Sequence, residues 1–221
     1  MKRRNIIKAL GAATVIGGLS ACKPKEQESN TPQAKQKTHH WKMVTAWPKN
    51  FPALGTGANF LAKIINQMSD GRLTVTVYGG GELVPALEVF DAVSNGTAEM
   101  GHAASYYWKG KAPEAQFFGA IPFGMNAQEM NAWLYHGGGL DLWTELYKPF
   151  NLVPFPVGQS GVQMGGWFNK EINTVEDIQG LVMRIPGLGG DVLKRAGGSP
   201  KLLPGSEIFT SLQTGNIDAT E

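Results

Sequence analysis

Residues 89–99 read VFDAVSNGTAE, and residues 208–218 follow the same plan as IFTSLQTGNID. Each segment predicts a helix that ends at a glycine, Gly96 or Gly215, followed by an acidic residue that leads into a strand. Two copies of one helix–strand unit, far apart in the sequence, indicate two similar α/β lobes. After the second copy the chain ends three residues beyond Asp218, so we expect the second lobe to be incomplete in this chain.

The segments around these two copies alternate between strand and helix patterns. Apolar residues recur at helical spacing from Leu54 to Met68, and residues 73–77 (LTVTV) alternate with the period of a half-buried strand. The whole succession predicts an α/β fold. Strands are expected at residues 41–47, 73–77, 98–104, 152–157, 162–168 and 181–185. Helices are expected at residues 54–68, 85–95, 127–147, 189–196 and 206–214. The helix at 127–147 is expected to break at the glycines 137–139, and a short capped helix is expected after Thr174.

The first 22 residues resemble an export signal. Residues 2–8 (KRRNIIK) are close to the twin-arginine pattern, and the apolar stretch that follows is too short to span a bilayer. Residues 19–22 (LSAC) resemble a lipobox, which is cleaved before a lipid-modified cysteine. We therefore predict a twin-arginine/lipoprotein signal peptide at residues 1–21 and a lipid on Cys22. A short N-terminal helix with an incidental cysteine is the alternative.

Residues 23–40 contain no Leu, Ile, Val or Phe and are rich in Lys, Gln, Glu, Thr and Pro. Such a composition cannot bury a core, so residues 22–40 are expected to be a flexible tether. The pair His39–His40 at its end could ligate a metal, but no third ligand lies nearby in the sequence, which favours a solvated linker end.

Charge and cysteine content exclude several classes of protein. Cleavage of the signal would remove four of the 20 basic residues, leaving 16 against 18 acidic ones, which does not suggest a nucleic-acid partner. The chain has one cysteine, so neither a disulfide framework nor a cysteine-based metal site is expected once Cys22 carries lipid.

Few residues look catalytic. His102 and Ser105 are close in sequence, but neighbours on a strand point to opposite faces, and no G-x-S-x-G motif surrounds a serine. The glycines in GLGG at residues 187–190 lack the third position of a dinucleotide fingerprint and indicate a tight turn.

Three residues are better candidates for ligand binding. Arg184 ends a predicted strand beside a helix start, where a guanidinium and a helix dipole together suit a carboxylate; a surface salt bridge is the alternative. Tyr107 belongs to an aromatic run that could line a cleft or pack in the core. Gln163 is polar within an apolar segment, where it could bind a ligand or simply be a satisfied amide.

The sequence from residue 41 to residue 221 resembles the substrate-binding proteins of tripartite ATP-independent periplasmic (TRAP) transporters. The motifs that carry the resemblance are AVxxGxAEM at residues 92–100, PFG at residues 122–124, NTxxDIxGLxMRIPG at residues 173–187 and PxxEIFxxLxxGxIDA at residues 204–219. Within the family, SYYW at residues 105–108 and VQMGGWF at residues 162–168 are most similar to the branch that binds 2-oxo acids together with a cation.

The resemblance implies a two-lobed periplasmic binding protein with a hinged cleft, and no catalytic cofactor. It implies Arg184 on the substrate carboxylate, Tyr107 close to the substrate, and Gln163 and Glu221 as ligands of sodium or another cation. The family's pattern continues beyond Glu221 with a tryptophan and a C-terminal helical region, so we expect this chain alone to bind its ligand poorly. The lipidated Cys22 departs from family members that are free in the periplasm.

The expected organisation is a first α/β lobe at residues 41–161 and a partial second lobe at residues 162–221. The expected function is non-enzymatic capture of a small organic acid, delivered to the permease subunits in the membrane, with the protein anchored by lipid at the periplasmic face of the cell envelope. Two alternatives stay open: a periplasmic enzyme acting on a small acid, with His102 or Glu221 as acid or base, and a ligand sensor without a transporter.

Overall fold

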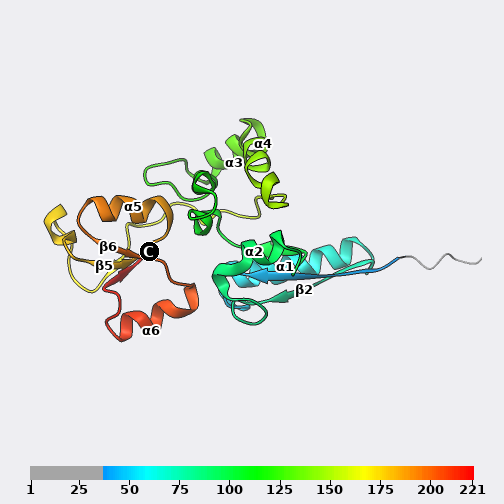
Figure 1. Cartoon of the computed structure of the whole chain (residues 1–221), viewed down its shortest axis with the longest axis horizontal. Helices are drawn as coiled ribbons and strands as arrows, with labels where there is room; N and C mark the ends of the chain where they lie inside the picture. Colours follow the sequence, from blue (N-terminus) through cyan, green and yellow to red (C-terminus); the bar gives the residue numbers. More distant parts are fainter. Residues whose placement is uncertain (1–36) are drawn as a thin grey trace, which may run out of the picture. The chain divides into compact units, whose positions relative to one another are not determined.

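The computed structural model describes residues 37–221, and their strands form two separate sheets (Figure 1). The strands are β1 (His39–Thr45), β2 (Leu73–Tyr78), β3 (Met100–His102), β4 (Trp167–Phe168), β5 (Val182–Arg184), β6 (Ser199–Lys201) and β7 (Ala219–Thr220). The α-helices are α1 (Leu54–Met68), α2 (Val89–Ser94), α3 (Ala127–His136), α4 (Gly139–Tyr147), α5 (Gly187–Arg195) and α6 (Ile208–Gln213). Short 3₁₀ helices are η1 (Ala86–Glu88), η2 (Ser105–Trp108), η3 (Pro113–Phe118), η4 (Lys148–Phe150), η5 (Val175–Ile178) and η6 (Gly205–Glu207).

The first sheet is parallel, in the order β2-β1-β3, and it is covered on both faces. Successive residues of a strand point to opposite faces. Met43 of β1 accordingly packs with Ala58 of α1, whereas Val44 packs with Val89 and Phe90 of α2. This two-sided burial explains the apolar run in the middle of β1.

The second sheet has the order β4-β7-β5-β6. Strand β5 is parallel to both β6 and β7, and the two-residue strand β4 is antiparallel to β7. Its core is small, with Leu181, Met183, Leu193 and Ala219 buried together. The α/β fold predicted from the sequence is confirmed.

The repeated unit occupies equivalent places in the two sheets. In each copy a 3₁₀ turn and a six-residue helix, α2 or α6, precede a glycine with positive φ, 79° at Gly96 and 73° at Gly215. The strand that follows each copy runs parallel to an inner strand of its sheet: β3 pairs with β1, and β7 pairs with β5. Although the chain ends three residues beyond Asp218, the second copy forms its strand, the two-residue β7, within the chain.

The structure corrects three local expectations. β1 begins at His39, so His39 and His40 are strand residues rather than the end of a tether, and His40 Nδ1 lies 2.5 Å from Thr74 Oγ1. The strand expected at residues 98–104 is only three residues long, and the aromatic run that follows lies in η2. No strand forms at residues 152–157, and of residues 162–168 only β4 is a strand. Prolines, which cannot donate to a ladder, and glycines interrupt this region at positions 154, 156, 158, 161, 165 and 166.

The signal peptide and Cys22 lie outside the described residues, and so does most of the expected tether. Within residues 37–221 no helix is both long enough and apolar enough to cross a bilayer. The two expected lobe ranges, residues 41–161 and 162–221, stay predictions. The strands of the first sheet come from the first range, except that β1 starts two residues earlier, and the strands of the second sheet come from the second range.

Candidate functional site

Arg184 is buried at the carboxyl end of β5, with 6% of its surface exposed. Its guanidinium is held by four hydrogen bonds. Nε donates to the Leu203 carbonyl (3.3 Å), Nη1 donates to the main-chain oxygen and to Oε2 of Glu221 (3.0 and 3.1 Å), and Nη2 donates to the Tyr107 hydroxyl (3.1 Å). A guanidinium has five N–H groups, so one N–H of Nη2 has no acceptor among residues 37–221. Arg184 does form an ion pair, with Glu221, but the pair is largely buried and is not the surface salt bridge that the sequence left open.

Glu221 forms an ion pair with Arg184, in which the two side chains are 17% and 7% exposed. Burial raises the pKa of the Glu221 carboxyl above its usual value, and the positive charge of Arg184 opposes that rise. The partly desolvated Glu221 carboxylate thus lies next to the fixed positive charge of Arg184, and binding of a proton or a metal ion to this carboxylate would change the net charge of the pair.

Tyr107 lies on the 3₁₀ turn η2, which follows β3 of the first sheet, and it contacts Arg184 at the end of β5 in the second sheet. Trp108, which is buried in the first core cluster, anchors this turn. The Tyr106 and Tyr107 rings meet edge to face with centroids 4.9 Å apart. Because the Tyr107 oxygen accepts a hydrogen bond from Arg184, its own O–H is available to donate. Burial raises the pKa of Tyr106, so this neighbouring phenol stays neutral.

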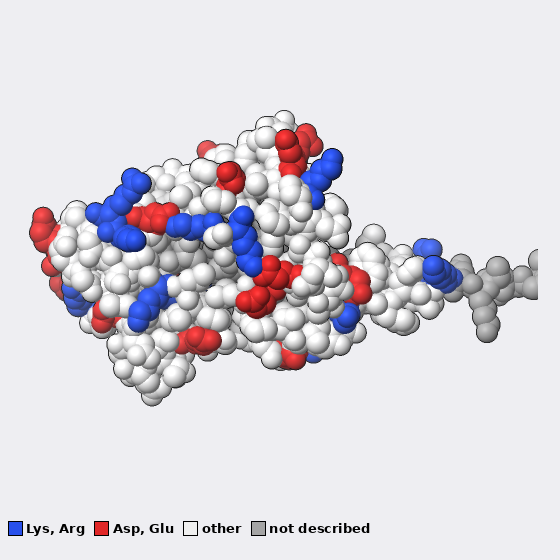
Figure 2. Space-filling view, in the orientation of Figure 1, with Lys and Arg blue, Asp and Glu red and all other residues white. Residues whose placement is uncertain are grey.

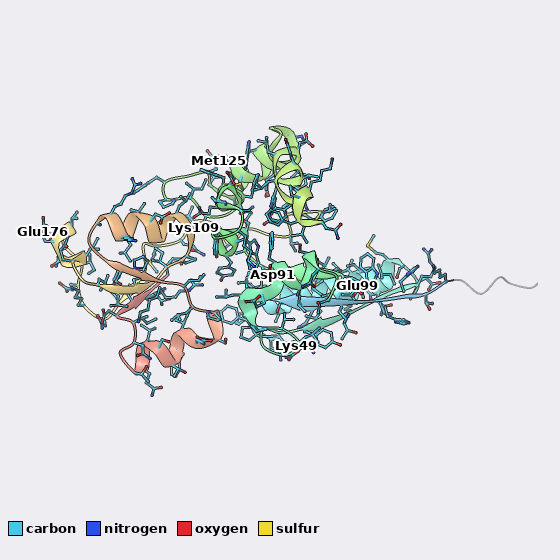
Figure 3. The ribbon with its side chains drawn as sticks, in the orientation of Figure 1. Lys49, Asp91, Glu99, Lys109, Met125 and Glu176 are labelled. Atoms are coloured by element: carbon cyan, nitrogen blue, oxygen red, sulfur yellow. The ribbon has the colours of Figure 1, made fainter. Side chains whose placement is uncertain are left out.

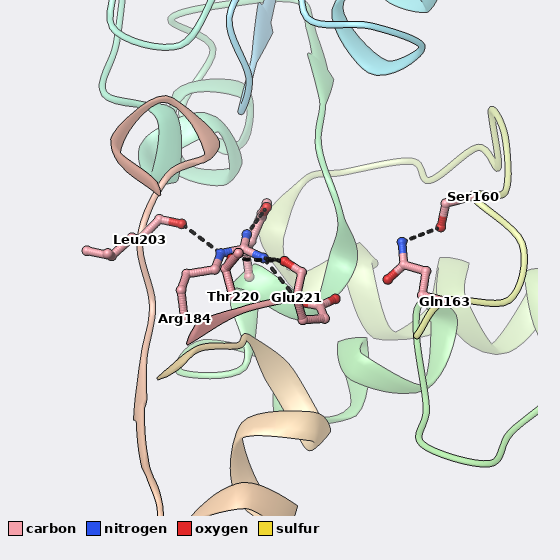
Figure 4. A network of polar contacts seen from close by, with 7 residues as sticks. Ser160, Gln163, Arg184, Leu203, Thr220 and Glu221 are labelled. Atoms are coloured by element: carbon pink, nitrogen blue, oxygen red, sulfur yellow. Dashed lines mark hydrogen bonds and ion pairs between the residues drawn. The ribbon is translucent and has the colours of Figure 1, made fainter. Parts of the chain in front are cut away.

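Gln163 lies in the irregular segment before β4 and is exposed, which corrects the expectation that it is a strand residue. Its Nε2 donates to Ser160 Oγ at 3.1 Å (Figure 4), and its amide oxygen has no donor within the described part of the chain. Gln163 and Glu221 both line one depression of about 310 Å³. The other lining residues are Val162, Met164, Gly166 and Trp167. The structure thus brings Arg184, Tyr107 and Glu221 into direct contact and places Gln163 at the same depression as Glu221.

The oxygen atoms at this depression suit a hard cation. Carboxylate and amide oxygens are ligands typical of sodium and calcium, whereas zinc favours nitrogen and sulfur. Within residues 37–221 no three His, Cys, Asp or Glu side chains cluster closely enough to bind a metal. A cation held by Gln163 and Glu221 would therefore need further oxygens from the backbone or from a bound ligand.

Two site features were not predicted from the sequence. The Leu203 carbonyl fixes Arg184, and Trp167, 67% exposed, lines the depression. A main-chain carbonyl carries no signal in the residue type. Trp167 was noted only as part of a motif, although a large exposed aromatic beside polar groups is typical of a binding surface.

His102, the candidate acid or base of the enzyme alternative, is engaged elsewhere. Its Nδ1 accepts a hydrogen bond from Trp47 Nε1 at 3.0 Å, and the two rings meet edge to face. Burial lowers the pKa of His102, which favours the neutral imidazole that this bond requires. Ser105 is buried, and its hydroxyl has no hydrogen-bond partner among the described residues. Neither side chain is bonded to the other.

Comparison with known families agrees with this fold of two sheets flanked by helices. Residues 43–221 match the model of the bacterial extracellular solute-binding proteins of family 7, the DctP family. The chain belongs to this family. It resembles the monocarboxylate 2-oxoacid-binding periplasmic protein of Nostoc sp. PCC 7120, with 47% identity over all of this chain and 60% of the relative.

Solved structures of TRAP periplasmic solute-binding proteins are similar as well. One from Pseudoalteromonas atlantica, with bound sodium and pyruvate, is 49% identical with a TM-score of 0.81, over 84% of this chain and 56% of that one. Another from Colwellia psychrerythraea, with bound calcium and pyruvate, is 46% identical with a TM-score of 0.80, over the same shares. The chain therefore spans somewhat more than half the length of these relatives.

Proposed function

We propose that this protein is the solute-binding component of a TRAP transporter and that it captures a small 2-oxo monocarboxylate together with a cation. The observation that carries the proposal is the buried guanidinium of Arg184, which is held by Tyr107 and Glu221 and retains one N–H without a partner among the described residues. A fixed, desolvated guanidinium is well suited to a carboxylate, because its hydrogen bonds to an anion are charge-assisted.

The groups around Arg184 fit the two ends of such a ligand. The ligand carboxylate would accept hydrogen bonds from Arg184 Nη2 and from the Tyr107 hydroxyl. Its 2-oxo oxygen and one carboxylate oxygen would chelate the cation, whose other ligands would include the Gln163 amide oxygen and the Glu221 carboxylate. One cation and Arg184 would then balance the charges of Glu221 and the ligand, which lowers the cost of burying all four.

The relatives support this assignment. The Nostoc relative is named for binding monocarboxylate 2-oxoacids, and two similar solved structures contain pyruvate with sodium or calcium. Pyruvate and its short 2-oxo homologues are accordingly the ligands that we propose. Lys and Arg are interspersed with Asp and Glu on the face in Figure 2, so the visible charge pattern offers no single-sign field for a polyanion.

A binding role is favoured over catalysis. His102 is bonded to Trp47, and the Glu221 carboxylate lies between Arg184 and the proposed cation, which is a binding role for both oxygens rather than a position for proton transfer. A ligand sensor without a transporter would use the same binding site, and it differs only in the partner that reads the bound form.

The test is calorimetric titration of the full-length protein with pyruvate and with propionate, which lacks the 2-oxo group. We expect saturable binding of pyruvate, at least tenfold weaker binding of propionate, and unchanged pyruvate in the NMR spectrum after incubation. Failure of every short 2-oxo acid to bind would overturn the proposed function. Conversion of pyruvate to a product would support the enzyme instead.

We further propose that the protein is exported, is anchored by a lipid on Cys22 and delivers its ligand to TRAP permease subunits. The residues 19–22 and the basic and apolar segments before them support the anchor. Several acyl chains on one cysteine would hold the protein to the membrane far more firmly than a single chain. Replacement Cys22→Ala should move the protein from the membrane fraction to the soluble fraction of the native host. An unmodified Cys22 in intact-mass analysis would contradict the anchor.

A further inference from the structure

Beside the proposed ligand site, two further contacts join the same two elements. Lys109, which follows η2 directly, forms an ion pair with Asp191 of α5, and Figure 3 labels Lys109 in this region. Gly187, the first residue of α5, lies so close to Tyr106 that a Cβ at position 187 would be 2.9 Å from Tyr106 Cβ. Segment 105–109 packs on the first sheet through Trp108, and α5 packs on the second, so these contacts connect the two sheets' cores.

A third observation concerns the start of α5. Its N-cap residue, Pro186, provides no side-chain cap, so the first N–H groups of the helix lack a side-chain acceptor from that residue. The buried Gln116 of η3 has an amide oxygen without a hydrogen-bond partner among residues 37–221, and this oxygen would be 3.6 Å from a Cβ at Gly187. Gln116 thus lies near the start of α5 without a hydrogen bond to it, so the contact between η2 and α5 depends on the Lys109–Asp191 pair and on the packing of Gly187 against Tyr106.

We propose that the Lys109–Asp191 ion pair and the close packing of Gly187 against Tyr106 form a latch that holds η2 against α5 while ligand is bound, and that this latch sets how long the ligand is retained. The inference rests on the proposed function. It adds residues that do not touch the ligand: η2 carries Tyr107 and β5 carries Arg184, so separating η2 from α5 would also separate the two ligand-binding side chains.

The expected size of the effect follows from exposure. The Lys109 and Asp191 side chains are 41% and 42% exposed. Ion pairs with that much solvent contribute from nothing to about 1 kcal/mol, which corresponds to at most about a fivefold change in a rate or equilibrium constant. Removing the pair should therefore accelerate ligand dissociation by two- to fivefold and leave association nearly unchanged.

The chain contains a matched control. Lys111 forms an ion pair with Asp91 of α2, and these side chains are 42% and 39% exposed. This pair lies entirely within the part of the chain that packs on the first sheet. Replacing Lys111 removes an ion pair of similar exposure but leaves the contact between η2 and α5 intact.

The experiment measures pyruvate dissociation by stopped-flow fluorescence in the full-length protein. Variants Lys109→Ala and Asp191→Ala should each dissociate two- to fivefold faster, and the exchange Lys109→Asp with Asp191→Lys should restore at least half of the loss. Variant Lys111→Ala should match the unaltered protein.

The outcome separates the latch from the proposed function. If the unaltered protein binds no 2-oxo acid, the proposed function fails. If it binds pyruvate but Lys109→Ala and Lys111→Ala have the same dissociation rate, the latch is overturned and the binding function stands. If the charge exchange leaves dissociation as fast as in the single variants, the direct pairing of Lys109 with Asp191 is overturned.

Discussion

Tyr107 and Arg184 are 77 positions apart in the sequence, yet the Tyr107 hydroxyl accepts a hydrogen bond of 3.1 Å from Arg184 Nη2. One residue comes from the turn after β3 and the other from the end of β5. The bond orients both groups so that a phenolic O–H and a guanidinium N–H remain next to each other as donors. Two adjacent donors, one of them charged, match the two oxygens of a carboxylate.

Replacement Arg184→Ala should weaken pyruvate binding by about one to two orders of magnitude, since a hydrogen bond to a charged group contributes about 1.5–3 kcal/mol. Replacement Arg184→Lys should recover little of the affinity, because an ammonium group cannot reproduce the planar set of donors. Isothermal titration calorimetry measures both, and Arg195→Ala, in an exposed position at the end of α5, is the control. Equal affinities of Arg184→Ala and Arg195→Ala would exclude Arg184 from the site.

Replacement Tyr107→Phe should weaken pyruvate binding by about one to two orders of magnitude, because its hydroxyl would donate to a charged carboxylate and such a hydrogen bond contributes about 1.5–3 kcal/mol. The ring and its packing against Tyr106 are kept, but Arg184 Nη2 loses an acceptor, so the melting temperature without ligand should fall modestly and the affinities are compared well below it. The control Tyr135→Phe removes a hydroxyl from a ring that is 55% exposed on α3. The assignment of Tyr107 fails if its hydroxyl can be removed with no change in affinity.

The repeated helix–glycine–strand unit is the part of the fold that the sequence predicts best, because its signals are local. A glycine with positive φ ends each helix, and the apolar residue before each strand is buried, as Ala98 and Ile217 show. The longest failure lies at residues 152–166, where β-branched and aromatic residues favour a strand but prolines and glycines prevent a regular ladder. Local propensity cannot decide between these opposing tendencies.

The candidate site could be predicted only in part, for a similar reason. Arg184 was found because the end of a strand and the start of a helix are both recognisable in sequence. Its contact with Tyr107, its burial and its bond to the Leu203 carbonyl depend on how distant segments pack. Gln163 is a candidate from the sequence because it is a polar residue in an apolar segment; the strand predicted there does not form, and its role as a cation ligand comes from the family resemblance.

The affinity for pyruvate in sodium should fall on acidification, and the fall should begin at a higher pH than for an ordinary glutamate with its pKa of 4.5. Burial raises the pKa of Glu221, so its carboxyl takes up a proton earlier as the pH decreases, and the protonated form is a poor cation ligand. Variant Glu221→Gln should bind more weakly at neutral pH and should show a flatter profile. Calorimetric titrations at a series of pH values test this, and parallel profiles for the two proteins would show that another group is responsible.

Replacing sodium with tetramethylammonium at constant ionic strength should weaken pyruvate binding, because the large organic cation cannot enter an oxygen-lined site. In Gln163→Ala the ratio of the two affinities should move toward one, since an oxygen ligand is lost. Gln67→Ala, on the exposed side of α1, should keep the ratio of the unaltered protein. Equal affinities in the two salts for the unaltered protein would argue against cation-assisted binding.

Replacement Gly187→Ala should lower both the melting temperature and the affinity for pyruvate. At a φ of +61° a Cβ costs about 1–2 kcal/mol, and here it would also press on Tyr106 at 2.9 Å, which forces α5 away from η2. Gly180→Ala shares the positive φ of 74° but has open space around it, and Gly205→Ala has neither constraint. Thermal unfolding and calorimetry should therefore rank Gly205→Ala above Gly180→Ala above Gly187→Ala in stability, while only Gly187→Ala loses affinity. If Gly187→Ala and Gly180→Ala bind pyruvate equally well, the close approach of α5 to Tyr106 has no part in holding the ligand.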